Sequence, residues 1–149
     1  MIMLMAAVPV GTTTVATDKP FESPKRQLTG DEAVIAYWTD VMDAIIEVES
    51  QGDEHAVCGR YAGAMQIAPV MVRECNDILR RQGKTQRFTL NDRYDTEKAK
   101  QMFIVYQSHH NPTADIEHAI RSWNGGNNYS RRATQRYYNK VMTAMANRH

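Results

Sequence analysis

Hydrophobic positions along most of the chain recur at spacings of three and four residues, the period of an amphipathic α-helix. The pattern predicts helices that begin near Thr29, Pro69, Asp95, Thr113 and Thr134. No segment alternates convincingly with the period of two that a half-buried strand shows, and no internal repeat is present. We therefore expect one mainly α-helical domain of five or more short helices.

The first helix has the clearest signals. Thr29 and Glu32 have the spacing of a capping box, in which each side chain satisfies a free backbone N–H of the other residue. Six apolar residues at helical spacing follow: Val34, Tyr37, Trp38, Val41, Ile45 and Val48. These residues predict one buried stripe, and the helix is expected to end within residues 49–52.

Proline and glycine mark the other boundaries. Pro69 suits the first turn of a helix that runs to Gly83. Pro112 ends the helix that Asp95 caps, because proline cannot continue the hydrogen-bond ladder. The run Gly125–Asn128 separates the last two helices. Residues 51–66 and 84–94 are predicted to be connecting loops.

Residues 1–28 read as a leader, and residues 29–149 as the folded domain. The run Met1–Val10 is apolar and about as long as the hydrophobic region of a secretory signal. However, no Lys or Arg precedes it and no clear small-residue cleavage site follows, so a flexible leader is the alternative. No apolar run reaches the roughly 20 residues that span a bilayer, so no transmembrane segment is expected.

Composition is that of an ordinary globular protein, with 42% hydrophobic and 23% charged residues. The net charge of +1 argues against a general nucleic-acid-binding protein, so no nucleic-acid partner is expected. The charge is nevertheless uneven, because no acidic residue follows Glu117. Six basic residues do follow it: Arg121, Arg131, Arg132, Arg136, Lys140 and Arg148. This end is either a solvated helix face or a surface for an acidic polymer.

Neither cysteine nor histidine indicates a metal centre or a cofactor site. Cys58 and Cys75 allow at most one disulfide and could equally remain buried thiols. His109, His110 and His118 lack the i, i+4 pair with an acid that a zinc-binding helix shows. We therefore expect no metal and no cofactor.

Glu49 is the residue best placed to carry chemistry. It lies where a mostly apolar helix face gives way to Ser50 and a glycine-containing loop. A carboxyl at such an edge is partly desolvated, which raises its pKa and suits it to general acid and base catalysis. Gly63–Gln66 adds an amide, and Trp123–Gly126 adds an aromatic platform beside a second amide. Sugars pack on aromatic rings and pair with amides, so the set favours a glycan ligand.

In this order along the chain, these elements resemble the catalytic domain of the soluble-lytic-transglycosylase (SLT) type, within the lysozyme-like superfamily. The similar blocks are Ile45–Ser50, Ala56–Val57 with Gly63–Ile67 and Pro69, Ala119–Gly126, and Tyr137–Val141. The blocks extend over about residues 33–142. The resemblance implies a lysozyme-like (goose-type/SLT) fold. It also leads us to expect a monomer that acts on the wall in the cell envelope or periplasm, or as a secreted or phage-encoded protein.

The resemblance further implies cleavage of the β-1,4 bond between N-acetylmuramic acid and N-acetylglucosamine in peptidoglycan glycan strands, with a 1,6-anhydro-muramyl end as product. Glu49 would be the single catalytic acid and base. The substrate-binding residues carried over are Ser50, Cys58, Met65, Gln66, Trp123, Asn124 and Tyr138, with Tyr137 as the competing match for the last. Cys58 stands where the family often has serine, and Trp123 where tyrosine is usual.

Two alternatives stay open at the level of sequence. Asp53 follows Glu49 closely enough to place a water molecule, which would make the protein a lysozyme-like hydrolase with two carboxylates. A catalytically weak glycan-binding or structural module on the same fold is the other alternative. In that case the basic C-terminal segment would hold the wall polymer or a nucleic acid.

Overall fold

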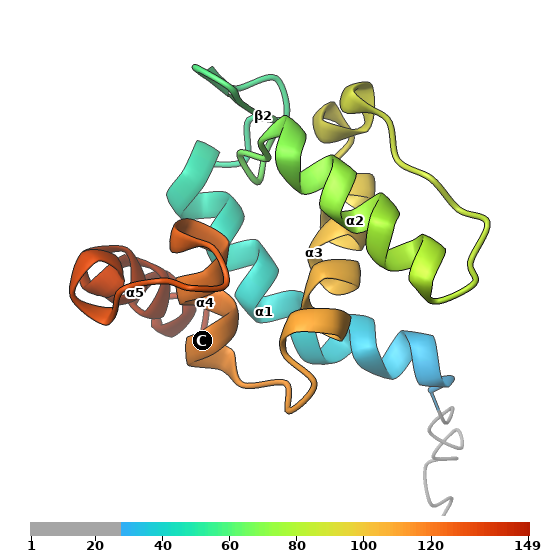
Figure 1. Cartoon of the computed structure of the whole chain (residues 1–149). Coiled ribbons are helices and arrows are strands. Elements are labelled where there is room, and N and C mark those ends of the chain that lie inside the picture. The colour runs from blue at the N-terminus through green and yellow to red at the C-terminus, as the bar shows by residue number, and fades with distance from the viewer. Residues whose placement is uncertain (1–27) are drawn as a thin grey trace, which may run out of the picture.

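Five α-helices, one 3-10 helix and a short β-hairpin make up the computed structural model, which describes residues 28–149 (Figure 1). The α-helices are α1 Gly30–Ser50, α2 Pro69–Arg81, α3 Thr96–His110, α4 Ile116–Gly125 and α5 Arg131–Ala146. The 3-10 helix η1 is Leu90–Tyr94, and the hairpin strands are β1 Val57–Cys58 and β2 Tyr61–Ala62. This confirms the prediction of a single, mainly helical globular domain. The predicted leader lies outside the described residues, except for Leu28.

Helix α1 begins and ends as local sequence requires. The capping box is confirmed: Thr29 Oγ1 accepts a hydrogen bond from the Glu32 N–H at 3.3 Å, and the Glu32 carboxylate accepts one from the Thr29 N–H at 2.9 Å. At the other end, Gln51 and Gly52 both have left-handed backbones, with φ of 54° and 85°. Two successive left-handed residues cannot continue the helix. Glu49 therefore lies in the last turn, beside a sharp change of chain direction.

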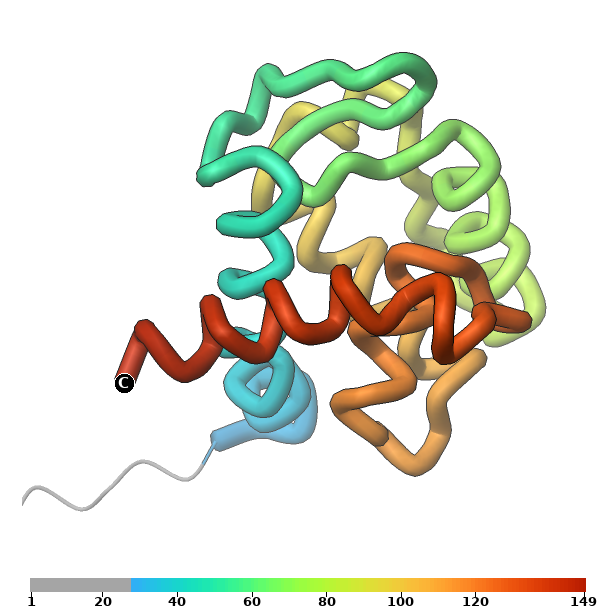
Figure 2. The backbone as a smooth tube through the Cα atoms, turned by 90° about the vertical axis from the view of Figure 1, so that its left-hand side faces the viewer, coloured from blue at the N-terminus to red at the C-terminus, as the bar shows by residue number. Residues whose placement is uncertain are grey.

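Helix α1 lies at the centre of the contacts among the helices. It packs against α3, α4 and α5, and α5 crosses it from residues far away in sequence (Figures 1 and 2). Apolar side chains of all five helices and of the loop before α2 form one core, which includes Ile45, Met65, Leu79, Phe103, Ile120 and Val141. Burial of each such side chain contributes about 1.5–3 kcal/mol to folding. The core thus fixes the end of α1 against α4 and α5.

The predicted buried stripe of α1 is shorter than expected. Trp38, Val41 and Ile45 are buried, but Val34 and Tyr37 are 43% and 49% exposed. The first turns of α1 extend beyond the other helices (Figure 1), so their apolar residues have little to pack against. The Tyr37 hydroxyl instead donates a 2.7 Å hydrogen bond to the Ala114 carbonyl. Periodicity alone could not show where packing partners end.

Two elements lie in segments predicted as loops. The hairpin pairs Val57 with Ala62 and Cys58 with Tyr61. Its strands have two residues each, too short for any period to appear, so the prediction of no strand was wrong. Helix η1 begins where the Asp92 carboxylate accepts a hydrogen bond from the Thr89 N–H at 2.7 Å.

The last two helices start at different residues from those expected. Helix α4 begins three residues later than Thr113, because the Asp115 carboxylate accepts a 2.6 Å hydrogen bond from the His118 N–H. Helix α5 begins three residues before Thr134, with Ser130 as its N-cap. Capping side chains set both starts. Within residues 28–149, no helix combines the length and apolar character needed to cross a bilayer.

Candidate functional site

Two hydrogen bonds join three of the sequence blocks at the end of α1. The Ser50 hydroxyl donates to the Ala64 carbonyl at 2.7 Å. The Trp123 indole N–H donates to the Met65 carbonyl at 3.2 Å. The loop Gly63–Ile67 therefore lies between the C-terminal end of α1 and α4. These bonds engage the hydroxyl of Ser50, the carbonyl of Met65 and the indole N–H of Trp123, and they hold the site together.

Glu49 lies half-buried in the last turn of α1. The Tyr137 hydroxyl, from α5, donates a 2.9 Å hydrogen bond to its Oε1. Burial raises the pKa of Glu49, and the Tyr137 bond offsets part of that rise because it favours the carboxylate. The pKa of Tyr137 is raised well above its usual value, mainly by its own burial and also by the charge of Glu49. Tyr137 thus stays protonated and remains a donor while Glu49 gains or loses a proton.

Gly63 serves a structural purpose. Its φ is +81°, and a Cβ on it would lie 1.7 Å from the Arg93 carbonyl oxygen. Because glycine has no Cβ, the backbone of η1 can pack directly against residue 63. The space beside Gly63 is therefore filled by protein backbone and is not open to a ligand.

Gln66 has an unusual backbone for a residue with a side chain. Its φ is +51°, in the left-handed region. The side-chain Nε2 donates to the carbonyls of Ala56 at 3.1 Å and Gly63 at 2.9 Å. These bonds orient the amide, and within residues 28–149 no hydrogen bond occupies its Oε1. Gln66 can therefore accept a hydrogen bond from a ligand.

The remaining residues of the predicted site differ in their access to solvent. Met65 is completely buried in the core, so its side chain is no glycan contact. Trp123 is half-buried, and its ring centre lies 5.1 Å from that of Phe103. Asn124, next to it, is exposed. Cys58 is exposed on β1 and has a free thiol. The accessible set is thus smaller than the predicted one.

Tyr137, and not Tyr138, contacts the carboxyl of Glu49. The ring of Tyr138 lies against the Arg121 guanidinium, at 4.5 Å from its centre. Of the two tyrosines that the sequence left as competing matches, Tyr137 is therefore the one beside Glu49. A sequence signal did exist, because Tyr137 shares a helical face with the buried residues Val141 and Ala144.

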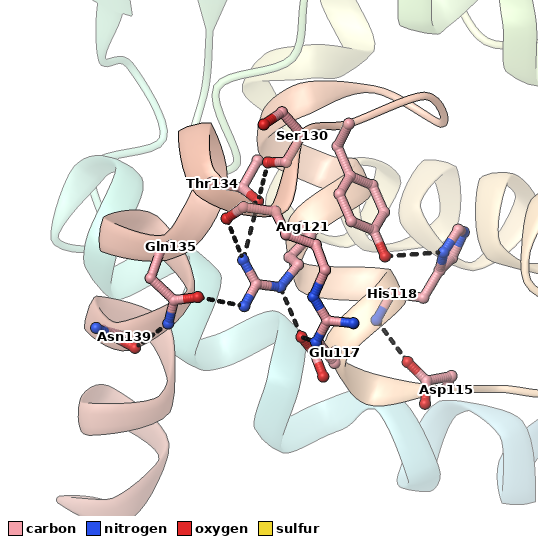
Figure 3. A network of polar contacts seen from close by, with 10 residues as sticks. Asp115, Glu117, His118, Arg121, Ser130, Thr134, Gln135 and Asn139 are labelled. Atoms are coloured by element: carbon pink, nitrogen blue, oxygen red, sulfur yellow. Dashed lines mark hydrogen bonds and ion pairs between the residues drawn. The ribbon is translucent and has the colours of Figure 1, made fainter.

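Arg121 anchors α5 to α4 (Figure 3). Its side chain is 3% exposed, and its Nε donates to the Glu117 carboxylate at 2.8 Å. One Nη donates to the Arg131 carbonyl at 2.9 Å, and the other to Gln135 Oε1 at 2.7 Å. The network fixes the start of α5 and thereby helps to place Tyr137.

An open groove of about 1340 Å³ lies between α1 and α5. It does not include Glu49, but Val48, Gln51 and Gly52 line its edge. A smaller cavity of about 320 Å³ lies among α2, α3 and the loop before α5, and is lined by Met71, Tyr106 and Asn127 among others. Neither cavity has Glu49 in its wall. Glu47 lines the groove and lies about 200° round the helix from Glu49, so the Glu49 carboxyl lies on a different face of α1 from the groove.

Other residues with possible chemistry have structural partners. Asp53 is exposed, and its Oδ1 accepts a hydrogen bond from the His55 N–H at 2.9 Å. His110 Nε2 lies 2.9 Å from the Glu74 carboxylate. Across residues 28–149, no three His, Cys, Asp or Glu side chains form a group able to hold a metal ion. Both cysteines are free, and burial raises the pKa of the Cys75 thiol to about 12.

Comparison with known proteins gives no further guide to the site. No protein-family model matches the sequence, and no curated protein is significantly similar to it. The function is therefore argued from the residues and their geometry.

Proposed function

We propose that this protein is a peptidoglycan lytic transglycosylase with a lysozyme-like fold. It cleaves the β-1,4 bond between N-acetylmuramic acid and N-acetylglucosamine and leaves a 1,6-anhydro-muramyl end. The observation that carries the proposal is the half-buried carboxyl of Glu49, with its raised pKa and its hydrogen bond from Tyr137. A raised pKa favours the protonated carboxyl that a general acid needs.

One carboxyl group is enough for the reaction. Protonated Glu49 gives its proton to the glycosidic oxygen as the bond from that oxygen to the muramyl C1 breaks. The substrate's 2-acetamido group stabilises the positive charge that develops at C1. The muramyl O6 then bonds to C1, and its proton passes to the Glu49 carboxylate. The acid is regenerated, and no water is consumed.

Tyr137 fits both halves of this cycle. Its hydroxyl donates to Oε1, which leaves Oε2 of Glu49 for the proton that moves. When Glu49 is a carboxylate, the same bond stabilises the negative charge. Burial raises the pKa of Glu49 and so favours its protonated state, whereas the hydrogen bond from Tyr137 lowers that pKa and favours the carboxylate.

The surroundings of Glu49 support a glycan ligand. Gln66 offers an oriented amide oxygen to a sugar hydroxyl or acetamido N–H. Asn124 offers an exposed amide beside the half-buried ring of Trp123. Asp53, the second carboxylate of the two-carboxylate alternative, is exposed and accepts a hydrogen bond from the His55 N–H within its own loop. The proposal of anhydro formation therefore rests on Glu49 as the single acid and base.

Analysis of the products of purified peptidoglycan by mass spectrometry tests the proposal. Anhydro-muramyl ends, lighter by one water than hydrated reducing ends, are expected from the wild type. Hydrated ends would identify a muramidase that uses the same glutamate. Wall binding without any cleavage would identify a glycan-binding module. We propose that the protein acts as a monomer on the wall, in the envelope, after secretion or as a phage-encoded enzyme.

A further inference from the structure

The groove between α1 and α5 carries an uncompensated stripe of positive charge. Arg132, Arg136 and Lys140 are spaced four residues apart on α5, so they lie on one face of the helix, and all three line the groove. Within residues 28–149, none of the three forms an ion pair or a side-chain hydrogen bond. A groove of this kind attracts an anionic ligand.

The basic residue at the far end of the groove differs from this stripe. Arg148 lies 3.0 Å from the Asp43 carboxylate and 3.9 Å from that of Glu47. Its charge is therefore neutralised by the two acidic residues that line the groove. The free positive charge is thus concentrated at Arg132, Arg136 and Lys140.

The rest of the lining suits a peptide. The lining also includes the amide side chains of Gln51, Gln135, Asn139 and Asn147 and the apolar side chains of Ile46, Val48 and Ala144. Gln135 is oriented from both ends, because its Oε1 accepts from Arg121 at 2.7 Å and its Nε2 donates to Asn139 at 2.8 Å (Figure 3). Backbone amides, small apolar side chains and carboxylates would all find partners here.

We propose that this groove binds the peptide stem of the peptidoglycan strand, with the free carboxylates of the stem on Arg132, Arg136 and Lys140. The inference rests on the proposed function. The stem is attached to N-acetylmuramic acid, the sugar whose C1 reacts at Glu49. Val48 and Gln51 line the groove close to Glu49 along α1, and Arg136 lines it next to Tyr137 on α5, although they lie on other faces of their helices. A stem that leaves the reacting sugar reaches the groove by passing round the C-terminal end of α1, where Gln51 and Gly52 line it.

Size also favours a branched polymer over a small molecule. The groove has a volume of about 1340 Å³, above the roughly 300–1,000 Å³ of pockets for drug-sized ligands. A peptide of a few residues occupies such a space without being enclosed. The strand would then be recognised twice, as a sugar at Glu49 and as an anionic peptide along α5.

The test compares two substrates and two triple variants. The substrates are glycan strands that carry stem peptides and the same strands after an amidase has removed them. The groove variant is Arg132→Gln, Arg136→Gln, Lys140→Gln. The control variant, Arg73→Gln, Arg81→Gln, Lys84→Gln, removes three exposed cations outside the groove, on α2 and just beyond its end. The measured quantity is the ratio of kcat/KM on peptide-bearing strands to that on peptide-free strands.

In the wild type and the control, the ratio is expected to favour peptide-bearing strands. In the groove variant it should fall roughly tenfold, the combined effect of three solvent-exposed ion pairs. A groove variant with the wild-type ratio overturns the inference and leaves the proposed function intact.

A binding measurement separates the two proposals. Titration calorimetry with a muramyl peptide, which has no scissile glycosidic bond, should show binding that the groove variant loses and the control keeps. If the wild type cleaves neither strand but shows this pattern, the proposed function fails and the groove assignment stands. Equal binding by all three proteins, or tighter groove binding of a short single-stranded DNA, overturns the groove assignment.

Discussion

The hydroxyl of Tyr137 donates a 2.9 Å hydrogen bond to Oε1 of Glu49 and so joins α5 to the last turn of α1 across 88 positions of sequence. The two helices cross (Figure 2). The crossing brings the side chains of Tyr137 and Glu49 within hydrogen-bond distance. Burial raises the pKa of Glu49 and the hydrogen bond lowers it, with burial the larger influence. The balance between the two makes Glu49 the centre of the proposed chemistry.

Replacement of Tyr137 by phenylalanine removes the bond that favours the carboxylate, so the pKa of Glu49 should rise further. The alkaline limb of the pH profile of kcat/KM, which reports loss of the Glu49 proton, should move to higher pH. Activity at the optimum should fall roughly 10- to 150-fold, since a lost hydrogen bond to a charged group costs about 1.5–3 kcal/mol. Initial rates across pH measure both effects.

Tyr138→Phe is the matched control for that variant. It keeps the ring that lies 4.5 Å from the Arg121 guanidinium and removes only a hydroxyl that is not on Glu49. The alkaline limb should stay where it is in the wild type. A shift with Tyr138→Phe and none with Tyr137→Phe would contradict the assignment of the two tyrosines.

Glu49→Gln should change the pH dependence of stability. The folded state holds the Glu49 proton more tightly than the unfolded state, whose pKa is near 4.5. Stability of the wild type is therefore lost as pH rises from about 4.5 through the raised folded pKa, and the glutamine variant escapes this loss. The difference in Tm should be small at pH 4 and favour the variant at pH 7. A wild type that gains on the variant as pH rises would show that the pKa is lowered.

Removal of the Arg121 side chain should destabilise the contact between α4 and α5. Arg121→Met leaves Gln135 Oε1 and the Arg131 carbonyl without their donor. Loss of one partner from a buried ionic network costs about 3 kcal/mol. The control is Arg131→Gln, which removes an ion pair to Glu117 from a side chain that is 73% exposed, and should cost less than about 1 kcal/mol. Urea denaturation measures both; equal costs would contradict the proposed role of Arg121.

Two glycines of the hairpin region give a matched pair. Gly63→Ala would place a Cβ 1.7 Å from the Arg93 carbonyl oxygen, and should cost about 3 kcal/mol or more because a backbone must move. Gly59→Ala meets no atom within 4 Å and has only the strain of its φ of +58°, about 1–2 kcal/mol. Thermal unfolding of the two variants compares them. A similar Tm for both would show that η1 does not constrain Gly63.

Sequence alone supplied the helices because their signals are local. The capping box at Thr29 and the apolar spacing around Ile45 depend on residues a few positions apart. The same information could not show that Val34 lies beyond its packing partners, because that depends on where α3 and α4 end. It also could not reveal a hairpin whose strands have two residues each.

The candidate site was predicted in its parts but not in its contacts. Glu49 was placed at the edge of an apolar face, and the structure has it half-buried there. The choice between Tyr137 and Tyr138 depends on how α5 crosses α1, which only the folded chain defines. Met65 and Gly63 belong to a motif that indicates ligand binding. In the structure, however, Met65 is buried in the core and Gly63 packs against the backbone of η1.

The central claim is that Glu49 moves the proton in glycan cleavage, and turnover of peptidoglycan by Glu49→Gln tests it most directly. The glutamine keeps an oxygen for the Tyr137 hydroxyl but has no proton to give. We predict at least a roughly 100-fold loss of turnover, the scale of general acid–base catalysis, with wall binding retained. Cleavage by Glu49→Gln at the wild-type rate would contradict the account.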